Sequence, residues 1–198
     1  MSKKTHEFTR PLGKRRYKKL FVISVEGSKT ERQYFNVFNQ LQSSALVKCL
    51  KRSPTKSSPV QVLRGMQNFL RKERLRKTDE AWIVVDKDDW TDEQLNRVLQ
   101  WAKEKEGYGL AISNPNFEYW LLLHFEDGRG ITNSRECMAR LRRYVPKYDK
   151  EIDGKKVALC ISKAVLRAKQ RDPRTDGFPP MWSTTVYRLV ERIMTDNK

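Results

Sequence analysis

The feature that most constrains this chain is a pair of apolar runs, rich in β-branched residues, that each end abruptly at an acidic residue. The first covers residues 19–25 and is followed by Glu26 and Gly27; the second covers residues 81–85 and is followed by Asp86. Continuous apolar runs of this length predict strands that are buried on both faces of a parallel sheet. Open α/β sheets bind ligands beyond the carboxyl ends of their strands. Both acids therefore stand where a binding site is expected.

Helical patterns alternate with the strand-like runs. Apolar residues at helical spacing predict helices over residues 29–41, 60–77, 91–106 and 115–125, and short apolar runs predict strands over residues 45–50 and 107–113. This alternation predicts an α/β fold in which a mostly parallel central sheet of about four strands is flanked by helices. The remainder, from about residue 131 to residue 198, is predicted to form a helical C-terminal extension, with helices over residues 134–144, 162–171 and 184–194.

Length and composition bound the class of protein. The 198 residues suit one domain, which we place at residues 20–198, preceded by a flexible basic arm over residues 1–19. No apolar run approaches the roughly 18–20 residues that a membrane span needs, and no secretory signal is recognisable, so we expect a cytoplasmic protein without membrane association. The three widely spaced cysteines argue against a disulfide framework.

The net charge of +17 favours a polyanionic partner, because basic side chains that contact phosphates release condensed counterions. We therefore expect the protein to bind nucleic acid, DNA or RNA. A charge that serves solubility, or one that complements an acidic partner protein, is the alternative. The candidate residues for backbone contact are Lys14, Arg15, Arg16, Lys51, Arg52, Arg71 and Arg74.

The acids that follow the two apolar runs suggest metal chemistry. If the strand that ends at Glu26 neighbours the strand that ends at Asp86, then Glu26, Asp86 and Asp88 converge, since residues two apart in an extended chain point the same way. Asp89 is a reserve candidate. Clustered carboxylates repel one another without a cation, and Mg²⁺ (or Mn²⁺) prefers such oxygen ligands. Glu26 is then the candidate general acid or base toward a phosphodiester.

Three further polar residues are possible members of the same site. Glu31 follows the first strand, and Asn116 and Glu118 follow the fourth. The alternative for all of these acids is structural, because carboxylates at a strand end cap turns and the first turns of helices. His124 lies in a helix that is apolar nearly all round, and it is predicted to be a core residue rather than a base.

Four segments of the chain resemble the RloB-like family, whose members are linked to bacterial restriction and abortive-infection loci. The most specific is the Asn-Pro-Asn-Phe-Glu-Tyr-Trp stretch at residues 114–120. The others are residues 25–35, residues 85–88 and residues 184–190.

The resemblance implies a fold and a function. The family is considered similar to Toprim domains, so a Toprim-like α/β domain is expected. Carried over onto this chain, it implies Glu26 as acid or base near the metal, with Asp86 and Asp88 as Mg²⁺ ligands. It also implies a Mg²⁺-dependent nuclease that acts as the effector of a bacterial anti-phage, abortive-infection system, with an ATPase encoded at the same locus as a partner.

Two alternatives to an enzyme stay open from the sequence. One is a non-catalytic nucleic-acid-binding subunit in which the acids only cap helices and turns. The other is a regulatory partner of a defence ATPase that uses its basic surfaces to hold an acidic protein.

Overall fold

A computed structural model describes residues 18–27, 29–41, 45–51, 58–87, 90–146, 148, 151–172 and 177–195. Residues 1–17, almost all of the predicted basic arm, lie outside these ranges. The described elements follow one another as β1 (Lys19–Val25), α1 (Thr30–Gln40), β2 (Ala45–Cys49), α2 (Pro59–Lys72), β3 (Glu80–Asp86), α3 (Asp92–Lys103), β4 (Tyr108–Asn114), α4 (Phe117–Leu122), α5 (Ser134–Tyr144), α6 (Gly154–Ala158), α7 (Ile161–Arg171), β5 (Ser183–Thr184) and α8 (Val186–Thr195).

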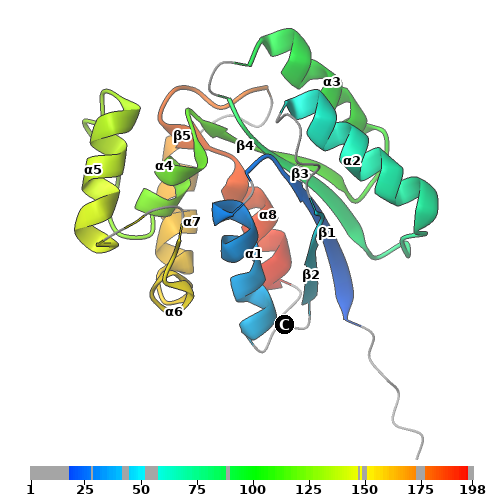
Figure 1. Ribbon diagram of the computed structural model, residues 1–198, viewed down its shortest axis with the longest axis horizontal. Coiled ribbons are helices and arrows are strands. Elements are labelled where there is room, and N and C mark those ends of the chain that lie inside the picture. Colours follow the sequence, from blue (N-terminus) through cyan, green and yellow to red (C-terminus); the bar gives the residue numbers. More distant parts are fainter. Residues whose placement is uncertain are drawn as a thin grey trace, which may run out of the picture.

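The strands that the structure describes form one five-stranded sheet in the order β2-β1-β3-β4-β5 (Figure 1). β1 is parallel to β2 and to β3, and β3 is parallel to β4. β5 runs antiparallel to the end of β4. The predicted α/β fold with a mostly parallel sheet is therefore confirmed.

β5 corrects the sequence analysis, which predicted about four strands and a purely helical C-terminal part. Ser183 and Thr184 pair with Asn114 and Ser113. The backbone N–H of the next residue, Thr185, donates to the carbonyl of Ile112 in β4. Two residues are too few to show a period of alternating polarity. These two residues form a strand because they pair with the end of β4, about 70 residues earlier, and the local sequence pattern does not show this pairing.

The sheet separates two cores, because successive strand residues point to opposite faces. In β1, Phe21, Ile23 and Val25 join the core shared with α1, α4, α7 and α8. Val22 joins the second core, beneath α2 and α3, which cover the other face (Figure 1). All four side chains are buried. Burial of each such side chain stabilises the fold by about 1.5–3 kcal/mol. Because β1 contributes side chains to both cores, the sheet packs against helices on both of its faces.

The predicted helices are present, with shifted ends. α2 begins after the N-cap Ser58 and ends at Lys72, well before the predicted residue 77, because Glu73 adopts an extended conformation. α3 begins after Thr91, which forms a capping box with Gln94. The short helix α6 was not predicted. None of the described helices is long and apolar enough to cross a membrane.

A buried carboxylate ties α8 to the amino ends of β1 and β3. Glu80, which is 2% exposed, accepts hydrogen bonds from Arg192 at 2.6–2.8 Å and from the indole of Trp82 at 2.8 Å, and it pairs with Lys19 at 2.7 Å. Burial by itself raises the pKa of this carboxyl. The hydrogen bonds from the three partners outweigh burial and hold its pKa below the usual value.

Candidate active site

The strand order reverses between β1 and β3. From β1 the chain passes through α1 to β2 on one side, whereas from β3 it passes through α3 to β4 on the other side. α1 packs on one face of the sheet and α3 on the opposite face, so the loops that follow β1 and β3 leave in opposite directions (Figure 1). Such a topological switch point is where open α/β sheets bind ligands.

Glu26 and Asp86 lie at this switch point, at the carboxyl ends of adjacent parallel strands. Val25 pairs with Val84, and the backbone N–H of Glu26 donates to the carbonyl of Val84 at 3.1 Å. The carboxylate of Glu26 accepts a hydrogen bond from the backbone N–H of Asp86 at 3.3 Å. The strand adjacency on which the convergence of these two acids depended is therefore present.

Trp90, to which the sequence analysis gave no role, also contacts Glu26. Its indole Nε1–H donates to Glu26 Oε1 at 2.9 Å, and its backbone N–H donates to the carbonyl of Lys87 at 2.9 Å. Together with the Asp86 N–H, the indole fixes the orientation of the Glu26 carboxylate. The tryptophan itself was visible in the sequence, just before the N-cap of α3. Its pairing with Glu26, 64 residues upstream, was not visible.

Glu31 lies against the loop that follows Glu26. It is 6% exposed, and its Oε1 accepts a hydrogen bond from the backbone N–H of Gly27 at 3.0 Å. A Cβ at Gly27 would stand 1.9 Å from Glu31 Oε2, so a larger residue here would displace this carboxylate from its present position. Glu31 also sits in the first turn of α1, where the helix dipole favours a negative charge. Its contacts make it a support of the β1–α1 loop.

Lys87 is the cation nearest in sequence to the acids. Its backbone N–H donates to the carbonyl of Ser113 at 2.8 Å, which continues the pairing of β3 with β4. Its ammonium pairs with Asp92 at 3.2 Å and lies 5.3 Å from the centre of the Phe178 ring. These contacts direct the lysine toward the start of α3.

The structure describes only some of the predicted metal ligands. Within the described ranges, no three Asp, Glu, His or Cys side chains lie close enough together to hold a metal ion. Asp88 and Asp89 fall outside those ranges. Glu26 and Asp86 nevertheless have the chemistry that Mg²⁺ requires, because this ion commonly takes one or two protein carboxylates and completes its shell with water and phosphate oxygens.

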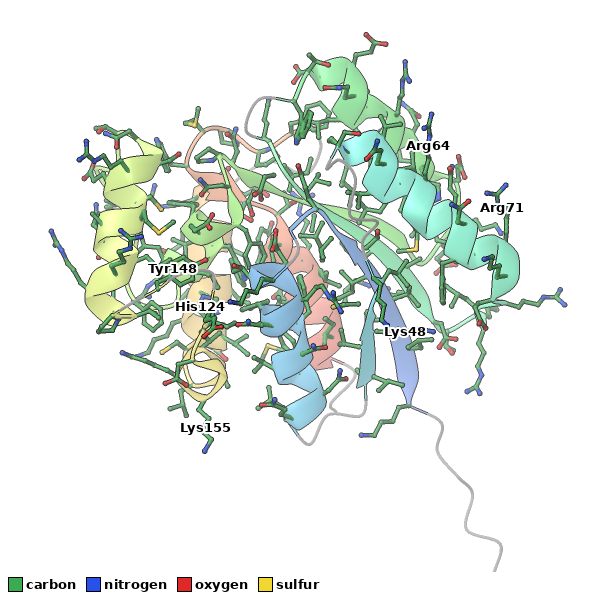
Figure 2. All side chains as sticks on the ribbon, viewed as in Figure 1. Lys48, Arg64, Arg71, His124, Tyr148 and Lys155 are labelled. Atoms are coloured by element: carbon green, nitrogen blue, oxygen red, sulfur yellow. The ribbon has the colours of Figure 1, made fainter. Side chains whose placement is uncertain are left out.

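Glu118 and Asn116 contact other parts of the protein. Glu118 is buried and accepts a hydrogen bond from the hydroxyl of Tyr148 at 3.3 Å, and that hydroxyl is also 3.3 Å from the hydroxyl of Thr30 at the start of α1 (Figure 2). Asn116 donates to Ser134 Oγ at 3.5 Å, at the start of α5. Glu118 thus reaches the helix that follows Glu26, whereas Asn116 reaches α5.

The predicted nucleic-acid contacts that the structure describes lie on the surface. Lys51, Arg71 and Arg74 are exposed, and Arg71 hydrogen-bonds Asn68. Figure 2 shows Arg64 and Arg71 projecting from the outer side of α2. Lys14, Arg15, Arg16 and Arg52 fall outside the described residues. α2 therefore presents a basic face to solvent.

His124 is a core residue, as predicted. It is 1% exposed, its Nδ1 lies 3.1 Å from the carbonyl of Trp120, and the rings of Tyr34 and Trp120 meet it edge to face. Burial, with a smaller contribution from the charge of Arg167, lowers the pKa of His124 to about 4. This histidine is neutral at physiological pH.

The described residues thus define an α/β protein with acids at the carboxyl ends of two central parallel strands. A family model described as RloB-like protein matches residues 21–193, and the chain belongs to that family. No curated protein and no solved structure matches the chain.

Proposed function

We propose that this protein is a metal-dependent nuclease with a Toprim-like catalytic domain, acting as the effector of a bacterial anti-phage, abortive-infection system. The observation that carries the proposal is the position of Glu26 beside Asp86 at the switch point of the sheet, with the backbone of Asp86 hydrogen-bonded to the carboxylate of Glu26. The family to which the chain belongs supports the defence role.

Asp86 and Asp88 are the residues that would hold Mg²⁺ or Mn²⁺, with Glu26 near the metal. Their carboxylates offer the hard oxygen donors that these ions prefer. Once bound, the metal would polarise a phosphodiester and offset the negative charge that develops on its oxygens.

Glu26 is, in this proposal, the group that holds or moves a proton at a carboxylate oxygen. General acid or base catalysis requires a side chain whose position is fixed before the substrate arrives. The hydrogen bonds from Trp90 Nε1 and from the Asp86 N–H supply that constraint. Glu31 supports it indirectly through its bond to Gly27.

The basic surface would bring the substrate to these acids. An acidic site alone repels a polyanion, whereas a net charge of +17 attracts it over the range of the Debye length. The exposed arginines of α2 and of the segment that follows it, Arg64, Arg71 and Arg74, are the described candidates for backbone contact.

A second candidate function is a nucleic-acid-binding subunit that performs no catalysis and works with an ATPase of the same locus. The observation that favours it is also the Glu26 contact set, because a carboxylate that accepts from an indole and a backbone N–H braces a loop effectively. The two functions differ in whether Asp86 needs its carboxylate.

The test is cleavage of a panel of DNA and RNA substrates in Mg²⁺, Mn²⁺ and EDTA. It compares the wild type with Asp86→Asn and Glu26→Gln, and uses Glu93→Gln, an exposed acid on α3, as the matched control. Metal-dependent cutting that disappears in the first two variants, with binding and melting temperature retained in Asp86→Asn, supports the nuclease. Cutting that survives Asp86→Asn would contradict it. An absence of cutting by every version, repeated with the ATPase of the same locus, would leave the binding subunit.

A further inference from the structure

A small basic pocket lies between the segment that follows α4 and the last turns of α7. It has a volume of about 240 Å³ and is lined by Asp127, Arg129, Arg167, Gln170 and Arg171. Three guanidinium groups therefore face one carboxylate. None of these residues belongs to the proposed catalytic site or to the basic face of α2.

Two of the arginines are held by backbone carbonyls. Arg167 donates to the carbonyl of Leu123 at 2.7 Å, and Arg171 donates through Nε to the carbonyl of Asp127 at 2.8 Å. The two side chains lie four residues apart on α7, which places them on the same face of the helix. Carbonyl oxygens orient a guanidinium but do not neutralise it. Within the described chain, neither arginine forms an ion pair with a carboxylate.

The single carboxylate of the pocket already has a partner. Asp127 accepts a hydrogen bond from the backbone N–H of Arg129 at 3.0 Å and pairs with Arg129 Nε at 3.1 Å. The nearby Arg140, whose Nη1 donates to the carbonyl of Arg129, pairs with Glu126. Asp127 supplies one negative charge against the three arginines that line the pocket, so the pocket keeps a net positive charge.

The net positive charge of the pocket points to an anionic ligand. Arg167 and Arg171 are both half-buried, and a guanidinium that is partly removed from water without a counterion loses solvation energy. A guanidinium presents its N–H groups in a planar fork that matches the oxygens of a phosphate. The pocket is smaller than the roughly 300–1,000 Å³ of typical drug-sized sites, which suits one such group.

We infer that this pocket binds one phosphate group of a nucleic-acid strand. The inference rests on the proposed function for the identity of the polyanion and adds a second contact to it. The phosphate is either a terminal monoester or an internal phosphodiester, because both present the oxygens that the arginine forks recognise.

The test is binding of the full-length protein to labelled oligonucleotides in EDTA, so that cleavage does not intervene. The pocket variant is Arg129→Gln with Arg171→Gln. The control variant is Arg97→Gln with Arg135→Gln, which removes the same charge from exposed positions on α3 and α5. Arg97 is matched to Arg129, since each forms an ion pair with a nearby carboxylate at 3.1 Å.

The pocket variant should bind about tenfold more weakly than the control at equal salt. The slope of log affinity against log salt should fall by about 0.7 for a single strand, which corresponds to one lost phosphate contact. Oligonucleotides with a 5′-phosphate or a 5′-hydroxyl separate the two sources. A preference of the wild type for the 5′-phosphate that the pocket variant loses assigns a terminal phosphate, and equal binding of the two assigns an internal one.

A pocket variant with the affinity and salt slope of the control would overturn the inference. Arg129→Gln alone, at a side chain that is 82% exposed, guards against misfolding of the double variant and should give part of the effect. As an independent readout, inorganic phosphate should raise the melting temperature of the wild type more than that of Arg129→Gln. Failure of the nuclease proposal leaves these binding results unchanged, because none of them requires cleavage.

Discussion

Replacing Trp90 with phenylalanine would remove the indole hydrogen bond to Glu26 and keep an aromatic ring in place. The bond joins Nε1–H to a carboxylate oxygen over 2.9 Å, and both residues are half-buried. A hydrogen bond to a charged group contributes about 1.5–3 kcal/mol, and partial exposure places this one near the lower end. In the proposed nuclease, that energy holds the carboxylate in its working orientation.

The expected result is a fall of about tenfold in kcat with little change in KM, because about 1.4 kcal/mol of transition-state stabilisation corresponds to a factor of ten. The residues proposed to hold the polyanion lie elsewhere, on α2, just after it and in the arginine pocket beside α7, so substrate binding should persist. Steady-state cleavage of the best substrate from the panel gives kcat and KM. Urea denaturation of the same samples gives the free energy of unfolding.

The chain offers a closely matched control near the start of β3, the strand that ends at Asp86. Trp82 Nε1 donates to Glu80 Oε2 at 2.8 Å, so Trp82→Phe removes the same kind of bond far from the switch point. This variant should lose stability and keep kcat. If Trp90→Phe instead cut at the wild-type rate and lost only stability, the indole would be a brace for the loop, and its role in positioning a catalytic carboxylate would be refuted.

Three further predictions concern stability. Gly27→Ala should cost about 1 kcal/mol in urea denaturation, because the new Cβ would displace the Glu31 carboxylate from its hydrogen bond with the Gly27 N–H. Gly65→Ala within α2, where the nearest atom is 3.7 Å away, should stabilise the helix by about 0.5–1 kcal/mol. Glu80→Gln should cost about 2 kcal/mol and lower the melting temperature, since it breaks the ion pairs of a carboxylate that is 2% exposed. Between pH 6.5 and about 4 the unfolded chain binds a proton that folded His124 does not, so stability should fall by up to about 3 kcal/mol as the pH drops through that window. His124→Leu should flatten this part of the stability profile, and an unchanged profile would show that another group controls it.

The elements that pattern alone can identify were predicted from the sequence, and their arrangement was predicted only conditionally. The runs before Glu26 and Asp86 are apolar because both faces of their strands are covered, and that requirement leaves a local signal. The adjacency of these two strands leaves none. It follows from the crossovers through α1 and α2, which place β2 and β3 on opposite sides of β1. The sequence therefore predicts that Glu26 and Asp86 lie close together only if their two strands are neighbours.

The residues that sequence reasoning missed are those whose role depends on a distant partner. Trp90 contacts Glu26 from the connection between β3 and α3. Arg167 and Arg171 form a pocket only with the loop at residues 127–129, about forty residues upstream. The spacing of the two arginines was visible, but exposed arginines at helical spacing are common. Only their carbonyl partners, Leu123 and Asp127, distinguish them from a solvated helix face.

A bracing role and a catalytic role for Glu26 make different demands on the same two hydrogen bonds. Both donors, the Trp90 indole and the Asp86 backbone, need an acceptor oxygen. Glu26→Gln puts an NH₂ group opposite one of them, so it should cost about 1–2 kcal/mol under either role, and lost activity in that variant is ambiguous. Asp86→Asn keeps the backbone N–H on which the bracing depends and replaces one charged carboxylate oxygen with an amide NH₂ group. Loss of cleavage in Asp86→Asn at wild-type stability would therefore assign a catalytic role to the pair of acids. Asp86→Asn is for this reason the more decisive of the two substitutions.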